Sequence, residues 1–186
     1  MRGKCVKKWL SALFIGLFVS VAAFADHPKD SWAIGPVNGV SIGIYDYGYY
    51  TNIGLSLKAP VVPIFWGIYA NLSHWGAGAG ITGDFYFIDR NIVETDATNE
   101  DGTYHLKLDW FLGVGGFFDF FMWDWGDYSF FNAGVRIPGG VSWHIVRPLE
   151  LSIGIAPGLG VTNWDKHIRF HFDVPLEISF RYWFLK

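Results

Sequence analysis

The last segment of the chain alternates between apolar and polar residues from Ile168 to Phe184. Successive side chains of a β-strand point to opposite faces, so this two-residue period predicts a strand with one apolar, aromatic-rich face and one polar face. The polar face carries charges of both signs, at Arg169, Asp173, Glu177 and Arg181. The environment of each face therefore decides the class of protein.

The same alternation recurs upstream, between turn-forming pairs such as Ala59-Pro60 and Arg147-Pro148. Together with the last segment it indicates eight strands, at residues 40–45, 51–58, 62–71, 80–87, 104–119, 132–145, 149–156 and 168–184. An even number of antiparallel strands joined by short turns is typical of an up-and-down barrel. We therefore predict an all-β fold, an eight-stranded antiparallel up-and-down transmembrane β-barrel in one domain.

Residue size indicates which face of these strands points inward. Small residues such as Gly67, Gly134 and Gly154 gather on the polar face, and the opposite face is almost entirely Ile, Leu, Val, Phe and Trp. An eight-stranded barrel is only just wide enough for its own side chains, so the bulky face would overfill the lumen of a soluble barrel, which is the alternative. We predict that the bulky face contacts lipid. Aromatic residues near the expected strand ends then predict two interfacial girdles; they include Tyr45, Tyr47, Tyr49, Tyr50, Trp75, Trp143, Trp164, Tyr182 and Phe184.

The first 25 residues have the pattern of a secretory signal peptide. Four basic residues precede an apolar run at 10–24, and Ala23-Phe24-Ala25 fits a cleavage site. The alternative, a retained membrane anchor, is disfavoured because the run is about 15 residues long and a spanning helix needs about 20. We predict a signal peptide at 1–25, cleaved after Ala25, and a barrel domain at 26–186.

Cysteine content and charge narrow the class further. The only cysteine, Cys5, lies within the predicted signal peptide, so an exported mature chain without cysteine points to a bacterial envelope. Of the 14 basic residues, four lie in the signal peptide, and the remaining ten face 17 acidic residues. The resulting net charge of about −7 makes nucleic acid an improbable partner, because phosphates require a basic surface.

The inward face of the predicted strands carries charges of both signs in near balance. Buried charges persist only when they are paired and hydrogen-bonded, so we predict a salt-bridge network that plugs the lumen. The alternative is a narrow ion path, because the many lumen glycines would leave space for water. The predicted network consists of Asp84, Lys107, Asp109, Arg136, Glu150, Arg169, Asp173, Glu177 and Arg181.

Catalytic and metal chemistry have little support in the sequence. Ser142, His144 and Glu150 have the residue types of a nucleophile, a base and an orienting acid, but any polar strand face with Ser and His produces such a trio. The six histidines are scattered, with His27 expected in the N-terminal tail. The acidic segment 94–102 lacks EF-hand spacing and is predicted to be a solvated turn. We predict no enzyme activity, no metal site and no cofactor.

An aromatic, acidic segment between the fifth and sixth strands is the best candidate for a surface interaction with an extracellular ligand. It falls at a predicted outer loop, where binding residues commonly lie. Its candidate residues are Trp123, Asp124, Trp125, Asp127 and Tyr128.

Over essentially all of residues 26–186 the chain resembles the OmpA/OmpX-like class of small outer-membrane barrels. More narrowly, segments 134–143, 148–160 and 181–184 look like the last three strands of a spirochaete-type OmpA-like family whose function is largely undefined. The resemblance implies location in the bacterial outer membrane, contact with its lipid, and insertion by an assembly machinery that binds the final strand through Tyr182 and Phe184. It also implies a structural or adhesin-like role, with a narrow channel for small solutes as the alternative.

Overall fold

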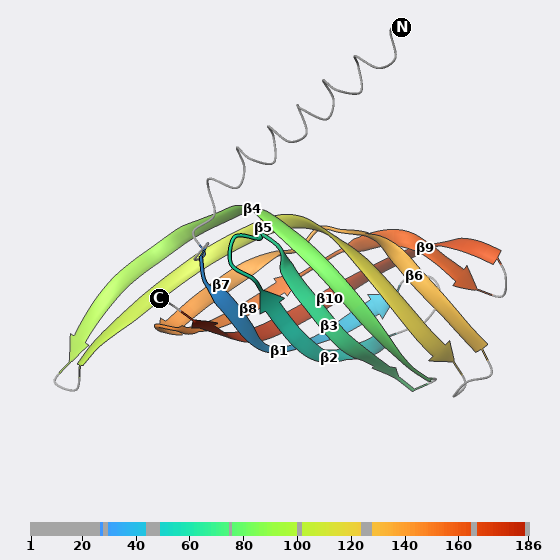
Figure 1. The fold of residues 1–186 in the computed structure, drawn as a ribbon, viewed down its shortest axis with the longest axis horizontal. Coiled ribbons are helices and arrows are strands. Elements are labelled where there is room, and N and C mark those ends of the chain that lie inside the picture. Colours follow the sequence, from blue (N-terminus) through green and yellow to red (C-terminus); the bar gives the residue numbers. More distant parts are fainter. Residues whose placement is uncertain are drawn as a thin grey trace, which may run out of the picture.

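The residues described in the computed structural model form one closed antiparallel sheet (Figure 1). They are residues 27, 30–43, 49–74, 76–99, 102–123, 128–164 and 167–184. The first and last strands pair from Trp32 with Phe184 to Gly43 with Asp173, which closes the barrel. The predicted all-β barrel is confirmed. The strand segments are β1 (Trp32–Gly43), β2 (Tyr49–Lys58), β3 (Phe65–Ser73), β4 (Gly76–Asn99), β5 (Gly102–Trp123), β6 (Tyr128–Arg136), β7 (Gly139–Val146), β8 (Leu149–Ile155), β9 (Gly158–Trp164) and β10 (His167–Phe184).

These ten segments make up eight strands of the barrel, because two strands are interrupted. β5 pairs with β6 over residues 115–123 and with β7 over residues 107–112, so β6 and β7 lie end to end. β10 pairs in the same way with β9 over residues 167–173 and with β8 over residues 176–182. The strand number therefore agrees with the number of alternating segments in the sequence.

Prolines explain the two interruptions. Pro138 separates β6 from β7 and Pro157 separates β8 from β9, and a proline has no N–H to donate to a neighbouring strand. Their carbonyls still accept hydrogen bonds, Pro138 from Gly113 N at 2.7 Å and Pro157 from Ile137 N at 2.9 Å. The barrel wall thus remains hydrogen-bonded across both breaks.

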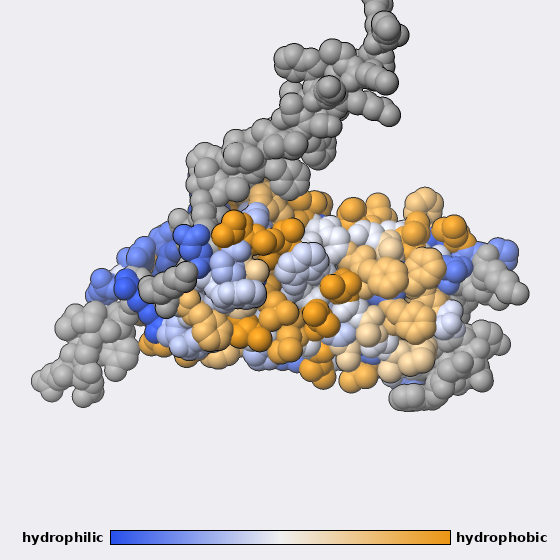
Figure 2. All heavy atoms as spheres, in the orientation of Figure 1, coloured by the Kyte–Doolittle hydropathy of each residue, from blue (hydrophilic) through white to orange (hydrophobic). Residues whose placement is uncertain are grey.

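The alternating pattern sorts side chains between the two faces as predicted. In β10, polar residues from His171 to Arg181 are buried or partly buried, whereas Leu176, Ile178 and Phe180 are 40–48% exposed. Figure 2 shows apolar side chains over the middle of the molecule and hydrophilic ones gathered at its ends. The barrel is polar inside and apolar outside. None of the described residues form a helix long and apolar enough to cross a membrane.

The two ends of the barrel differ. The end at which β1 starts and β10 finishes, called here the terminal end, also holds the β2–β3 and β4–β5 connections; the opposite end is called the loop end. β4 and β5 pair with each other as far as Asn99 and Gly102, whereas β3 leaves β4 at Asp84. A long hairpin therefore projects from the terminal end, seen in Figure 1 as the green and yellow-green ribbons that run furthest to one side.

This hairpin corrects the prediction for the acidic segment 94–102, which the sequence indicates is a turn. Strand pairing continues along its described residues as far as Asn99 and Gly102, with Glu94 opposite Lys107 and Asp96 opposite His105. Beyond Lys107, which also pairs with His144 of β7, the described residues of the two strands pair only with each other, so no burial pattern marks the segment as strand in the sequence. Opposite charges placed directly across a strand pair add a modest stabilisation.

Candidate functional site

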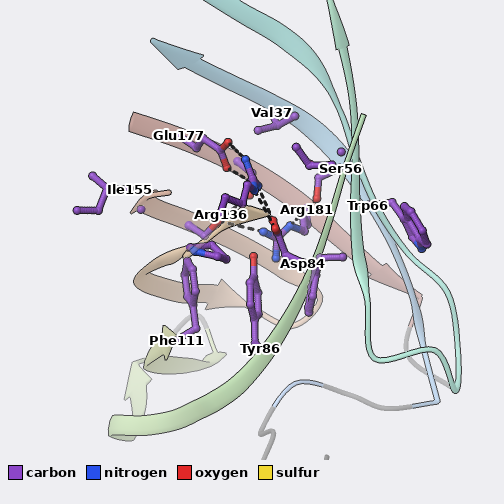
Figure 3. A pocket seen from close by; sticks show the side chains of 17 residues that line it. Val37, Ser56, Trp66, Asp84, Tyr86, Phe111, Arg136, Ile155, Glu177 and Arg181 are labelled. Atoms are coloured by element: carbon purple, nitrogen blue, oxygen red, sulfur yellow. Dashed lines mark hydrogen bonds and ion pairs between the residues drawn. The ribbon is translucent and has the colours of Figure 1, made fainter. Parts of the chain in front are cut away.

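Arg136, in β6, lies in the lumen between two carboxylates from other strands (Figure 3). Its Nε donates a 2.8 Å hydrogen bond to Asp84 Oδ1, and its Nη2 contacts the other oxygen of the same carboxylate. Its Nη1 donates to Glu177 Oε1 at 2.6 Å. Arg136 and Asp84 are only 5% and 3% exposed. Because an unpaired charge is costly at such burial, these contacts explain how the charges are tolerated inside the barrel.

A second ion pair lies nearer the terminal end. Arg181 Nη1 donates to Glu150 Oε1 at 2.8 Å, and Arg181 Nε donates to Ser56 Oγ at 3.1 Å. The other carboxylate oxygen of Glu150 accepts a hydrogen bond from Trp183 Nε1. Glu150 is fully buried, so both of its oxygens are satisfied by protein groups. The pair joins β10 to β8 and β2.

Aromatic side chains fill the lumen at the terminal end. Phe65, Tyr86, Phe111 and Trp183 form a buried cluster together with Ala33. The Tyr86 ring stacks between two others, with centroid distances of 4.5 Å to Phe65 and 4.6 Å to Phe111. Arg181 lies over the Phe65 ring at 4.8 Å, so the aromatic layer and the second ion pair are in contact.

A second aromatic cluster, of Tyr50, Phe121 and Phe130, is buried at the loop end. Tyr50 Oη donates a 3.1 Å hydrogen bond to Asp173 Oδ2, and its ring meets Phe121 edge-on at 5.3 Å. This corrects the prediction of Tyr50 as an interfacial girdle residue, because the register of β2 points it into the lumen. Its neighbour Tyr49 is 75% exposed and does lie on the outside.

Aromatic rings lie against the glycines of the inner face. A Cβ added at Gly140 would lie 2.9 Å from Phe111 Cζ and 2.2 Å from a backbone oxygen, and one added at Gly113 would lie 2.7 Å from the Tyr86 ring. These glycines therefore accommodate large neighbours rather than leave open space. A cavity of about 40 Å³ remains beside Arg136 and Arg181, room for a few waters.

His27 enters the lumen at the terminal end, which corrects its predicted place in an N-terminal tail. It is 4% exposed, its backbone N donates to Asp89 Oδ2 at 3.0 Å, and its Nδ1 contacts the same oxygen. Its Nε2 lies 3.4 Å from Glu150 Oε1. Burial lowers the pKa of the His27 imidazole, but the charge of Glu150 and the contact with Asp89 outweigh burial and raise that pKa to about 9.

The structure groups most of the predicted lumen charges but not all of them. Lys107 Nζ lies 3.2 Å from Asp109 Oδ2, apart from the two arginine pairs. Asp173 is buried and bound to Tyr50. Arg169 is exposed, contrary to the prediction; it lies on the part of β10 past Asp173, the last residue that pairs with a described residue of β1. Residues 167–170 of β10 are exposed on both faces, so alternation no longer separates inside from outside there.

The Ser142, His144 and Glu150 trio does not form a hydrogen-bonded relay among the described residues. Ser142 Oγ is buried and makes no hydrogen bond there. His144 Nε2 lies 3.5 Å from Asp109 Oδ2. His144 and Glu150 are directly opposite in the β7–β8 register, as the short turn between them predicts.

Sequence reasoning missed Asp89, which is 1% exposed and contacts His27. Asp84 and Tyr86 also face inward, so regular alternation would place Asp89 outside. A register shift between Tyr86 and Ile88 inserts one extra residue and turns Asp89 inward. The signal in the sequence is that Asp89 would interrupt an otherwise apolar face if the alternation stayed regular.

The candidate surface loop can be placed only by its ends. Trp123 ends β5, Tyr128 begins β6, and the two are paired at the loop end. Asp124, Trp125 and Asp127 lie outside the described residues.

Comparisons with known proteins give similarity at the level of fold. The sequence matches no protein-family model and no curated protein. Among solved structures, Neisserial surface protein A has a TM-score of 0.47 at 8% identity, covering 81% of this chain and 96% of its own. The N-terminal β-barrel domain of Pseudomonas aeruginosa OprF has a TM-score of 0.41 at 9% identity, covering 83% and 98%. Ail, the attachment invasion locus protein of Yersinia pestis, has a TM-score of 0.32 at 13% identity, covering 82% and 97%.

Proposed function

We propose that this chain is an integral outer-membrane β-barrel whose lumen is closed and which acts as a structural or surface-interacting protein of the bacterial envelope. The observation that carries the proposal is the belt of exposed apolar residues on a closed barrel. Among the described residues, 36 large apolar side chains are more than a third exposed, including Ile53, Ile68, Val114, Ile153 and Ile178. Monomeric soluble proteins rarely expose apolar surface on this scale, whereas a barrel in lipid requires it.

The closed lumen is supported by its contents. From the terminal end to the loop end it holds an aromatic layer, two arginine-centred ion pairs and a second aromatic layer. A charged group paired on several sides moves aside only at high energetic cost, so this filling opposes free passage of ions. A structural or adhesin-like role follows more naturally from a filled barrel than transport does.

Two measurements on one sample test this proposal. The refolded mature chain should migrate differently on gels before and after heating, as stable barrels do, and should insert into lipid vesicles. In a planar bilayer, the same folded sample should give no stepwise conductance. Failure to insert would contradict the membrane location, and steady single-channel currents would contradict the closed lumen.

A narrow channel is the second candidate function. The cavity between Arg136 and Arg181 is lined by charged and hydroxyl groups, including Glu177, Ser56 and Ser152, which could hold water. If this cavity is part of a path, Arg136→Ala should raise the conductance above that of the wild-type chain. The bilayer experiment described above separates the two candidates.

The proposed partner during insertion is the outer-membrane assembly machinery, bound through the final strand. Tyr182 and Phe184 lie on the outer face of β10, 45% and 52% exposed. We expect Phe184→Ala to slow insertion in cells. Trp32→Ala is the matched control, because Trp32 is 56% exposed and pairs with Phe184 from the neighbouring strand. Equal effects of the two variants would contradict a specific role for the final strand.

A surface role is tested at the loop that joins Trp123 to Tyr128. Replacing residues 124–127 with a Gly/Ser segment of equal length should lower the binding of intact cells to host or environmental surfaces. Unchanged binding by cells with normal amounts of the folded barrel would remove this loop as the interaction site.

A further inference from the structure

Three side chains of metal-binding types meet at the terminal end of the lumen: His27, His144 and Glu150. His27 precedes β1, and the other two lie directly opposite each other on β7 and β8. One possible ligand atom from each residue lies within 4.8 Å of the others. His27 and Glu150 are buried and His144 is partly buried, so the cluster is largely screened from bulk solvent.

Two imidazole nitrogens in this cluster form no hydrogen bond with any described residue. His27 Nε2 lies 3.4 Å from Glu150 Oε1, and His144 Nε2 lies 3.5 Å from Asp109 Oδ2, in both cases without hydrogen-bond geometry. Buried polar atoms nearly always have a partner, so each such nitrogen requires an explanation. A ligand that accepts the lone pair of an imidazole nitrogen would satisfy them.

The neighbouring groups are arranged as around a metal centre. Asp89 contacts His27 Nδ1 and also accepts the His27 backbone N–H, which fixes the ring and turns Nε2 toward Glu150. A metal-binding histidine commonly has its second nitrogen bound to a carboxylate in this way. Glu150 is held in turn by Trp183 and Arg181.

The local charge is compatible with a bound cation. Three carboxylates, Asp89, Asp109 and Glu150, surround the cluster, and the nearby cations are Arg181, 2.8 Å from Glu150, and Lys107, 3.2 Å from Asp109. A protonated His27, in contact with Asp89, supplies the third positive charge. A metal ion bound to His27 Nε2 would displace that proton and keep the buried carboxylates compensated.

We propose that His27, His144 and Glu150 bind a divalent transition-metal ion, and that Zn²⁺ fits this donor set best. Two imidazoles and one carboxylate form a common set of zinc ligands, with a fourth position left for water or for Asp109. In a tetrahedral zinc site with bonds of about 2.0–2.2 Å, the ligand atoms lie about 3.4 Å from one another. The ligand atoms of His27, His144 and Glu150 lie up to 4.8 Å apart, so side-chain rotations must shorten the longest of these separations on binding. A bound ion would fasten the start of the mature chain to the β7–β8 hairpin. Predicted cleavage after Ala25 leaves His27 in place.

The test is calorimetric titration of Zn²⁺ into the mature chain, folded in detergent, treated with a chelator and free of any affinity tag. We expect one Zn²⁺ per chain. His27→Gln and His144→Gln should each lower the affinity by about 100-fold or more, since loss of an outer partner alone costs 10–100-fold. His167→Gln is the matched control, because His167 is exposed at the loop end. This variant should bind Zn²⁺ with the same affinity as the wild-type chain.

Heat-modifiable gel migration confirms that each variant is folded before titration. If a variant does not fold, X-ray absorption at the zinc edge on the folded wild-type chain decides the question, and we expect two imidazoles and one carboxylate around the metal. Absence of binding, binding that survives both substitutions, or a zinc environment without histidine would overturn the proposal. None of these outcomes depends on whether the barrel conducts ions or binds a surface ligand.

Discussion

Arg136 and Asp84 form a two-point contact across the lumen between strands that are not neighbours in the sheet. Nε of Arg136 donates to Asp84 Oδ1 at 2.8 Å, and β5 lies between the strands that carry the two residues. The contact therefore adds a cross-link that the backbone ladder does not provide. Glu177 contacts the same guanidinium from β10, so one arginine joins three strands.

This geometry predicts unequal effects of the two partners on stability. Arg136→Met leaves Asp84 and Glu177 without their shared cation and should cost about 3–5 kcal/mol. Asp84→Asn leaves Arg136 paired with Glu177 and should cost about 1–3 kcal/mol. Urea unfolding in lipid vesicles, followed by tryptophan fluorescence, measures both values. Equal losses of unfolding free energy in the two variants would show that Glu177 does not stabilise Arg136 once Asp84 is neutral.

The sequence predicts the barrel and its inward face because few other structures fit a two-residue period with small residues on one face. It places Arg136, Glu150 and Arg181 inside, where they are found. Three features could not be predicted. A bulge turns Asp89 inward from a position that regular alternation assigns to the apolar face, the entry of His27 depends on contacts 62 residues away, and Arg169 lies on a part of β10 that is exposed on both faces.

Glycine at position 140 should be required by the close approach of the β8 backbone. A methyl group there would meet the Ile153 carbonyl oxygen at 2.2 Å and Gly154 Cα at 2.6 Å, and neither is the end of a flexible side chain. Gly140→Ala should therefore destabilise the barrel by about 1–3 kcal/mol, the usual cost of overpacking. Gly116→Ala is the control, because its nearest atom would be 3.5 Å away. Similar unfolding midpoints for the two variants would contradict this account of the glycines.

The hydroxyl of Tyr50 should contribute to stability at the loop end. Tyr50→Phe keeps the ring against Phe121 but removes the 3.1 Å hydrogen bond to Asp173. We expect a loss of about 0.5–1.5 kcal/mol, measured by urea unfolding. Tyr49→Phe, at the exposed neighbouring position, should have no measurable effect. If both substitutions were neutral, the Tyr50–Asp173 contact would contribute nothing to stability.

The outer face provides the sharpest test of the environment of the barrel. Ile178 is 45% exposed and lies opposite Asn38, near the middle of β1. In lipid, Ile178→Arg should cost about 2–4 kcal/mol, because arginine is least tolerated at the bilayer midplane. Phe170→Arg, on the part of β10 that is exposed on both faces, should cost about 0–1 kcal/mol. On a soluble barrel both positions would face water and an arginine at either would be nearly neutral, so equal small effects in vesicles would contradict a membrane-spanning belt at Ile178.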